Sequence, residues 1–324
     1  MSKFLIVFAL GIAAIFVFAG VALANKEPPA PEEYYLVTKP NPKEINVITK
    51  FGENEQLIWS FNKKDWGTWN IFWLSVTDNT EPIPVVDGKN RRDVAGGGTD
   101  WEYVWRGGPK GKQPEWMGGN HGNERLVSLT LEGDGEILDP VKDLTKEEDR
   151  IFHNVVIREE TRLTNPGMEG DIAAIVREYS FVPGGLRLKY TVEWLQDVRL
   201  DIGYAQMFPV SKTYGRHFRF GGYDKTYSFE DNKQSGVFRG FVDSIEAFFW
   251  GDAEPNLRLH AFLTDKSAVL DYKYTADMAR VWDVTANQVK LYFAQFSNKG
   301  ATSVAKGTKW IIQSGWDIYR EGAK

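Results

Sequence analysis

The stretch Ile175-Val-Arg-Glu-Tyr-Ser-Phe-Val-Pro-Gly-Gly-Leu-Arg-Leu-Lys-Tyr-Thr-Val-Glu-Trp194 alternates apolar and polar side chains on both sides of a glycine turn. An alternation of period two is typical of a strand with one buried face. Pro183-Gly-Gly185 predicts a hairpin turn between two such strands. One face of the first strand carries Ile175, Arg177, Tyr179 and Phe181, and one face of the second carries Leu186, Leu188, Tyr190, Val192 and Trp194.

The same alternation recurs along most of the chain. Further strands are predicted at 126–131, 235–242, 246–250, 257–263, 288–296 and 309–319. A short helix is expected only at 142–151, and 267–279 is ambiguous. Many short strands at about ten-residue spacing predict an all-β fold, a large antiparallel β-sandwich or jelly roll.

A long segment at residues 86–122 is rich in Gly and Trp and poor in strand pattern. Loops of this length without secondary structure are usually functional or disordered. The aromatic content argues against disorder. We therefore expect a long functional Trp/Gly-rich loop in this fold.

The N-terminal segment predicts export. Lys3 is the one charged residue before an apolar run at 4–21, and Ala22-Leu-Ala24 is a cleavage pattern. The run is also long enough to be an uncleaved membrane anchor, and only then would the protein contact a membrane. The predicted organisation is a signal peptide or anchor at 1–24, a Pro-rich lead-in at 25–44 and one domain at 45–324, with a secreted, periplasmic or cell-surface location.

Composition narrows the class of partner. The chain has no cysteine, which excludes thiol chemistry, and its net charge of −5 does not suggest a nucleic-acid groove. Seven of the 12 Trp lie between Trp59 and Trp116. Trp is core or interface material, and its flat face also packs on sugar rings. Trp101, Trp105 and Trp116 are therefore candidate sugar-binding residues.

The run Gly118-Gly-Asn-His-Gly-Asn-Glu124 places one imidazole among glycines, amides and a carboxylate. His121 could act as a base, with Asn120, Asn123 and Glu124 as further candidates for catalysis and substrate binding. The alternative is a tight turn whose polar side chains satisfy their own backbone. No metal-ligand spacing accompanies His121, so no metal or other cofactor is expected, although a structural Ca²⁺ is compatible.

Glu132-Gly-Asp-Gly-Glu136 resembles the E-x-D-x-E signature of the laminarinase-type jelly-roll glycosidases. That resemblance implies Glu132 and Glu136 as the two catalytic carboxylates. The glycines instead favour two strands joined by a Gly-Asp-Gly turn.

Arginine, tyrosine and histidine on predicted strands suggest another chemistry. β-Elimination of a uronic acid requires neutralisation of its carboxylate, a base and a proton donor. We assign His121 as base or neutraliser, Asn120 and Arg177 as neutralisers, and Tyr190 as proton donor or base. His217 and Arg219, which share a strand face, are candidate substrate-binding residues.

The chain is similar in style to exported β-sandwich polysaccharide lyases and related carbohydrate-active proteins. The likeness lies in the loop around His121, the Arg177-Glu-Tyr strand and the closing segment 304–319. It implies an acidic polysaccharide as partner and lyase activity. The alternatives are a glycoside hydrolase, a sugar epimerase of the mutarotase type, and a non-catalytic glycan-binding or envelope structural protein.

Overall fold

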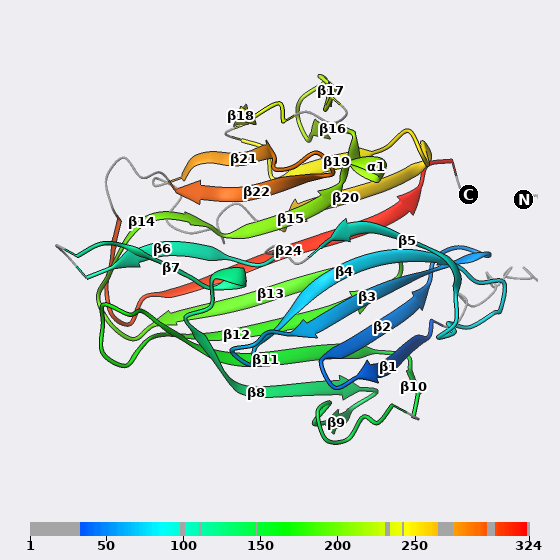
Figure 1. Cartoon of the computed structure of the whole chain (residues 1–324), viewed down its shortest axis with the longest axis horizontal. Coiled ribbons are helices and arrows are strands. Elements are labelled where there is room, and N and C mark those ends of the chain that lie inside the picture. Colours follow the sequence, from blue (N-terminus) through cyan, green and yellow to red (C-terminus); the bar gives the residue numbers. More distant parts are fainter. Residues whose placement is uncertain are drawn as a thin grey trace, which may run out of the picture. The chain divides into compact units, whose positions relative to one another are not determined.

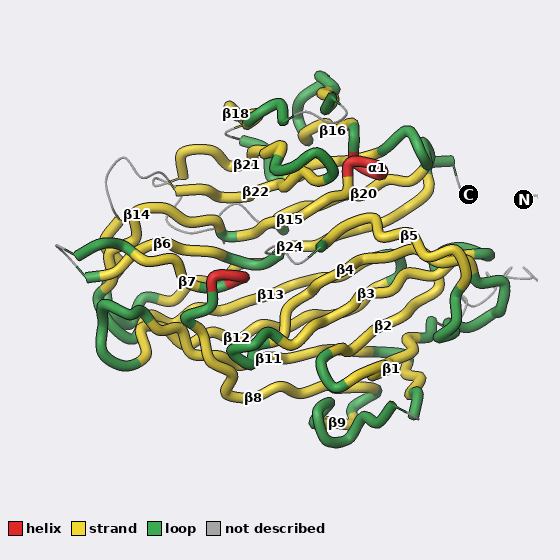
Figure 2. Tube along the Cα trace, viewed as in Figure 1, coloured by secondary structure: helices red, strands yellow, loops and turns green. Residues whose placement is uncertain are grey.

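The computed structural model describes residues 33–97, 101–109, 112–146, 148–230, 234–241, 243–264, 275–296 and 302–322. Among these residues the regular secondary structure is nearly all antiparallel strand (Figure 2). The described helices are the four-residue α1 (Lys212–Gly215) and the one-turn 3₁₀ helix η1 (Gly119–His121). The predicted export segment at 1–24 lies outside the described residues. Within the described part of the chain, no helix is both long and apolar enough to cross a membrane.

Two sheets pack face to face and form a β-sandwich (Figure 1). The fourteen-stranded sheet contains β1 (Tyr35–Asn41), β2 (Glu44–Lys50), β3 (Glu55–Lys63), β4 (Trp69–Asp78), β5 (Lys89–Gly96), β6 (Val104–Gly108), β7 (Glu115–Met117), β10 (Arg150–Phe152), β14 (Val198–Tyr204), β15 (Gln206–Ser211), β18 (Val237–Phe241), β21 (Thr275–Asp283), β22 (Gln288–Phe296) and β23 (Thr302–Val304). The ten-stranded sheet contains β8 (Glu124–Gly133), β9 (Glu136–Leu138), β11 (Val155–Thr164), β12 (Asp171–Val182), β13 (Gly185–Trp194), β16 (His217–Phe220), β17 (Tyr227–Ser228), β19 (Glu246–Trp250), β20 (Leu257–Leu263) and β24 (Lys309–Arg320).

The hairpin predicted at residues 175–194 is present. Strands β12 and β13 pair from Ala173 opposite Trp194 to Val182 opposite Gly185. Gly184, at φ +64°, completes the turn, a conformation that favours glycine. The other predicted strands are also present, and the all-β sandwich is confirmed.

The segment Glu132-Gly-Asp-Gly-Glu136 contains a turn. Strand β8 ends at Gly133, Asp134 and Gly135 have φ of 50° and 85°, and β9 begins at Glu136. The Asp134 carboxylate accepts hydrogen bonds from the backbone N–H groups of His153 and Asn154. These backbone hydrogen bonds hold the pKa of Asp134 below its usual value. The three acids therefore do not share one strand face, and the assignment of Glu132 and Glu136 as paired catalytic carboxylates loses its basis.

The helix expected at 142–151 is absent from the described part of that segment. Instead the Asp139 carboxylate accepts hydrogen bonds from the N–H groups of Val141 and Lys142 and holds a turn. Side chains that capture nearby N–H groups compete with helix formation. Strand β10 then begins at Arg150.

Two further segments differ from expectation. Strand β1 lies within the predicted lead-in at 25–44, because Tyr35 and Val37 are buried in the core despite the flanking prolines. The predicted long loop at 86–122 contains β5, β6, β7 and η1. Irregular register between β4 and β5 hides the alternation there.

Candidate functional site

The three residues proposed to act together in catalysis lie in two environments. His121 is exposed on η1. Arg177 and Tyr190 are direct cross-strand partners on β12 and β13, and both side chains are fully buried between the sheets. The Tyr190 hydroxyl donates a hydrogen bond to the backbone oxygen of Ala205. Because a polysaccharide cannot reach a fully buried group, Arg177 and Tyr190 do not serve the roles expected of them.

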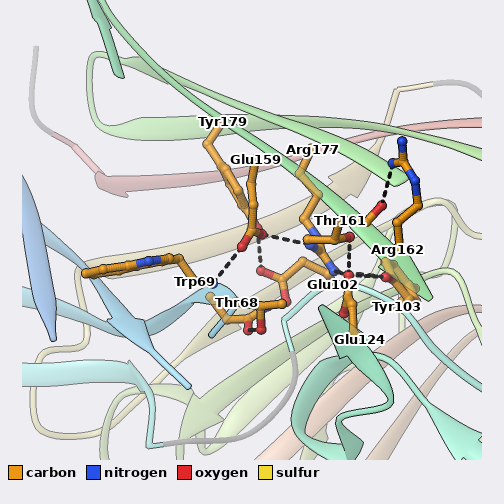
Figure 3. A network of polar contacts seen from close by, with 11 residues as sticks. Thr68, Trp69, Glu102, Tyr103, Glu124, Glu159, Thr161, Arg162, Arg177 and Tyr179 are labelled. Atoms are coloured by element: carbon orange, nitrogen blue, oxygen red, sulfur yellow. Dashed lines mark hydrogen bonds and ion pairs between the residues drawn. The ribbon is translucent and has the colours of Figure 1, made fainter. Parts of the chain in front are cut away.

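Arg177 is the cation of a buried polar network that joins the two sheets (Figure 3). Its guanidinium donates to Glu159 Oε2 at 2.7 Å and to Glu124 Oε1 at 2.5 Å. It also donates to the Tyr103 hydroxyl at 2.9 Å, which itself donates to Glu124 at 2.8 Å. Glu124, expected to bind substrate, is therefore a structural partner of Arg177.

Glu159 holds the sheets together from the other side of the network. Its Oε1 accepts a hydrogen bond from the backbone N–H of Trp69 on β4 at 2.7 Å. Burial raises the pKa of Glu159 to about 8, although the charge of Arg177 acts to lower it. A third buried carboxylate, Glu102, accepts from the Tyr179 hydroxyl at 2.6 Å. Two carboxyl groups, those of Glu124 and Glu159, thus contact one guanidinium, and a proton on Glu159 reduces the excess of negative charge beside it.

Trp101 and Trp105 are core residues with no exposed face. Trp101 packs edge-on against Trp59, Trp316 and Phe208. Trp105 stacks on Tyr103, with centroids 4.1 Å apart, and packs against Trp194. Neither ring is open to a sugar, whereas Trp116, the third candidate, is half-buried.

The loop that carries His121 is a compact turn seated on the core. Gly118, at φ +80°, lies against the Tyr103 ring, and a Cβ atom at Gly118 would come within 2.3 Å of that ring. Asn123 donates to the Trp116 backbone oxygen at 2.8 Å. Asn120 accepts a hydrogen bond from Lys64 Nζ at 2.5 Å. Both amides therefore brace the turn, while the imidazole remains outside.

Trp116 and His121 form a stacked pair beside a charged pair. The ring centroids lie 5.0 Å apart with an interplanar angle of 17°. The Arg106 guanidinium lies over the Trp116 ring at 5.3 Å and makes a bidentate ion pair with Asp201. On β6, Trp105 faces the core, so Arg106 lies on the outer face of the fourteen-stranded sheet.

The same outer face continues across β14, β22 and β21. Trp116 and Tyr204 both pack against a small apolar cluster of Val104, Met207 and Tyr292. Arg280 lies over the Tyr204 and Tyr292 rings, 4.9 Å from each centroid, and donates to the Tyr204 hydroxyl at 2.7 Å. We name this surface the Trp116 patch; its residues are Arg106, Trp116, His121, Asp201, Tyr204, Arg280 and Tyr292.

His217 and Arg219 lie elsewhere, on the outer face of the ten-stranded sheet. His217 contacts Ser228 Oγ at 2.7 Å and Asp252 Oδ1 at 2.9 Å. Arg219 lies over the Phe248 ring at 5.5 Å. His217 and Arg219 lie on the same strand, β16, as predicted. None of these contacts involves His121.

Sequence reasoning missed Arg106, Tyr204 and Arg280. A signal for Arg106 was present, since Tyr103 and Trp105 face the core and alternation then turns Val104 and Arg106 outward. No local pattern brings Tyr204 and Arg280 together, because they meet through strand order. Among the described residues, no group of three or more His, Asp or Glu side chains is arranged to hold a metal.

No model of a known protein family matches the sequence, and no curated protein matches it. Solved structures resemble the fold. The α-galactosidase AgaB of Geobacillus stearothermophilus aligns with 89% of this chain and 41% of its own, with 7% identity and a TM-score of 0.50. The galactosidase domain of the α-galactosidase–sucrose kinase AgaSK gives 89% and 42%, 9% identity and a TM-score of 0.48.

A proposed aldose 1-epimerase of Klebsiella pneumoniae subsp. pneumoniae aligns with 86% of this chain and 80% of its own. Its identity is 9% and its TM-score is 0.44. This chain spans about two fifths of the length of the α-galactosidases that it matches. At these identities the likeness is one of fold.

Proposed function

We propose that this protein binds a carbohydrate at the Trp116 patch. The observation that carries the proposal is the stacked Trp116–His121 pair on the outer face of a sheet, next to the Arg106–Asp201 ion pair. A sugar ring has an apolar face of C–H groups and a rim of hydroxyls. It therefore suits a surface with a flat aromatic ring bordered by planar polar side chains, which both donate and accept hydrogen bonds.

The charges of the patch favour an acidic glycan. Arg106 and Arg280 are cations of the patch, Lys290 lies 5.6 Å from the Tyr292 ring centroid, and Asp201 is the anion paired with Arg106. Two of the cations, Arg280 and Lys290, are mostly buried, so solvent screens their charge less than that of an exposed side chain. A local excess of positive charge can attract an anionic ligand although the net charge of the chain is −5.

AgaB, which resembles this chain in fold, is named an α-galactosidase, and this name also points to carbohydrate as the class of ligand. No residue role is transferred from it. We retain export to the cell surface, periplasm or medium as part of the proposal, since the apolar run and cleavage pattern at 4–24 motivate it.

The binding test uses alginate, pectate, ulvan and glycosaminoglycans in affinity electrophoresis and titration calorimetry. Trp116→Ala should weaken binding to the preferred polymer by about tenfold or more, because it removes the aromatic platform. Phe262→Ala is the matched control. Phe262 is a half-buried aromatic flanked by His260 and Arg187, but it lies on the other sheet. Equal losses in both variants, or no binding of any polymer by the wild type, would reject the proposal.

A second candidate function is β-elimination of the bound glycan, and the hydrogen bond between Arg280 and the Tyr204 hydroxyl favours it. Burial raises the pKa of Tyr204, and the charges of Arg280, Arg239 and Arg106 act against that rise. In this scheme Tyr204 takes the place first assigned to Tyr190, and Arg106 that of Arg177.

The reaction would proceed as follows. His121 or Tyr204 takes the proton from the carbon next to the carboxylate, whose charge Arg106 and Asn120 neutralise. The freed electron pair forms the carbon–carbon double bond and the bond to the glycosidic oxygen breaks. That oxygen receives its proton from the other of His121 and Tyr204, the one that did not act as the base. Unsaturated product absorbs in the ultraviolet. Its formation by the wild type and its loss in Tyr204→Phe, with binding retained, would support the reaction; binding without product would reject it.

A further inference from the structure

A second concave site lies on the outer face of the ten-stranded sheet, remote in the fold from the Trp116 patch. It is a pocket of about 250 Å³ with walls from β16, β19, β20 and β24 and from the segment after β16. Its principal lining residues are Arg219, Asp224, Thr226, Trp250, Arg258 and Tyr319. Its volume suits one sugar residue better than a chain.

The floor of the pocket is aromatic and carries two guanidinium groups. Arg258 lies over the Trp250 ring at 5.3 Å and is ion-paired with Glu321. Arg219 lies over Phe248 and has no carboxylate partner among the described residues. The pocket therefore holds one guanidinium whose charge is already paired and one that is open to an anionic ligand.

The rim of the pocket offers oxygen groups. The Asp224 carboxylate and the Thr226 hydroxyl make no side-chain hydrogen bond to a described residue, and the Tyr319 side chain is 40% exposed. Burial raises the pKa of Tyr319, so its phenol keeps its proton and can donate at neutral pH. A ligand with both hydroxyl groups and an anionic group would satisfy this set.

We propose that this pocket binds a single sugar residue that carries a carboxylate, either a free uronic acid or the end of an acidic glycan. Arg219 binds the carboxylate in a bidentate manner, and Asp224 accepts hydrogen bonds from neighbouring ring hydroxyls. Thr226 and Tyr319 contact the remaining hydroxyls. The site is separate from the Trp116 patch and does not depend on glycan binding there.

The test measures binding of galacturonate and glucuronate, with galactose and glucose as neutral counterparts, by titration calorimetry and saturation-transfer difference NMR. The wild type should bind at least one uronate more tightly than its neutral counterpart. Arg219→Ala should weaken that uronate by about tenfold or more and remove the preference, because a charge-assisted hydrogen bond is lost. Arg219→Lys should retain the charge and part of the preference.

Arg187→Ala is the matched control, since Arg187 lies over Phe262 at 5.0 Å on the same sheet but does not line the pocket. Arg187→Ala should leave uronate binding unchanged. Absence of uronate binding in the wild type, or equal losses in Arg187→Ala and Arg219→Ala at unchanged thermal stability, would overturn it. Loss in Trp116→Ala alone would move the site to the Trp116 patch.

Discussion

The indole of Trp116 and the imidazole of His121 are stacked with centroids 5.0 Å apart, and a hydrogen bond from Asn123 to the Trp116 carbonyl oxygen closes the loop between them. The imidazole can therefore hold the indole in place, act chemically, or do both. Aromatic pairs contribute about 0.5–1.5 kcal/mol beyond the area that they bury.

Two substitutions at His121 separate these roles. His121→Phe keeps an aromatic partner for Trp116, so polymer affinity should stay within about twofold of the wild type. His121→Ala removes it and should weaken affinity by about two- to tenfold. Calorimetric titration with the preferred polymer measures both. If the protein is a lyase and His121 is the base, both variants lose product formation. Equal affinities for all three proteins would show that His121 does not position Trp116.

Removal of the Arg177 charge should strongly destabilise the fold. Arg177→Met leaves the buried Glu124 carboxylate without its cation and Glu159 without its donor, and breaking a buried pair in this way typically costs about 3–5 kcal/mol. Arg158→Met is the control, because Arg158 pairs with Glu160 and Glu178 on the exposed face of the same sheet and should cost less than about 1 kcal/mol. Urea unfolding measures both. The double variant Arg177→Met/Glu124→Gln should recover part of the loss, and no recovery would argue against a charge origin.

The raised pKa of Glu159 predicts a loss of stability as the pH rises from about 4.5 to about 8. The folded protein keeps this proton up to about pH 8, whereas an ordinary glutamate loses it near 4.5. The native state therefore binds more protons between these values. The stabilisation that the Glu159 proton gives the folded state is complete below pH 4.5. It is lost as the pH rises through about 8, by at most about 1.4 kcal/mol per pH unit.

Glu159→Gln tests this linkage, since an amide cannot titrate. Unfolding free energies from urea titrations at pH 5, 6.5 and 8.5 should fall with pH in the wild type and fall less steeply in the variant. The comparison concerns the slope, because the amide also changes the hydrogen bond from the Trp69 N–H. Parallel pH profiles would contradict a raised pKa at Glu159.

The fold was predictable because its main signal is local. Alternation along residues 175–194 and the Pro-Gly-Gly turn specify a hairpin, and the structure has it. Similarly, Gly-Asp-Gly at 133–135 specifies the turn between β8 and β9. The segments that were misjudged are those where a long-range contact overrides local composition, such as β1, which pairs with β2 and β10.

The candidate site was less predictable than the fold, because roles were assigned from residue type and not from the strand face on which each residue lies. Arg177 shares its face with Ile175, Tyr179 and Phe181, and the same alternation that predicted the strand also placed Arg177 in the core. Tyr190 shares its face with Leu188 and Val192 in the same way. By contrast, the contact of Arg280 with Tyr204 depends on the pairing of β14 and β21 with β22, which no local pattern reveals.

The last prediction concerns Gly118, which seats the His121 turn. Gly118 (φ +80°, ψ 172°) and Gly135 (φ +85°) both have a positive φ, so an alanine at either position is strained. Only at Gly118 does the added Cβ meet another group, the Tyr103 ring at 2.3 Å; at Gly135 it has nothing within 4 Å. Gly118→Ala should therefore be the more destabilising by about 1–3 kcal/mol, the usual cost of overpacking a core.

The same substitution should also weaken polymer binding, because Tyr103 cannot move without disturbing its stack on Trp105 and its hydrogen bonds to Glu124 and Arg177. The turn must shift instead, and Trp116 and His121 shift with it. Urea unfolding and calorimetry on Gly118→Ala and Gly135→Ala give both quantities. Weaker binding in Gly118→Ala, at a temperature where both variants are folded, would link the buried network to the surface site; equal binding would show that the turn absorbs the extra methyl group.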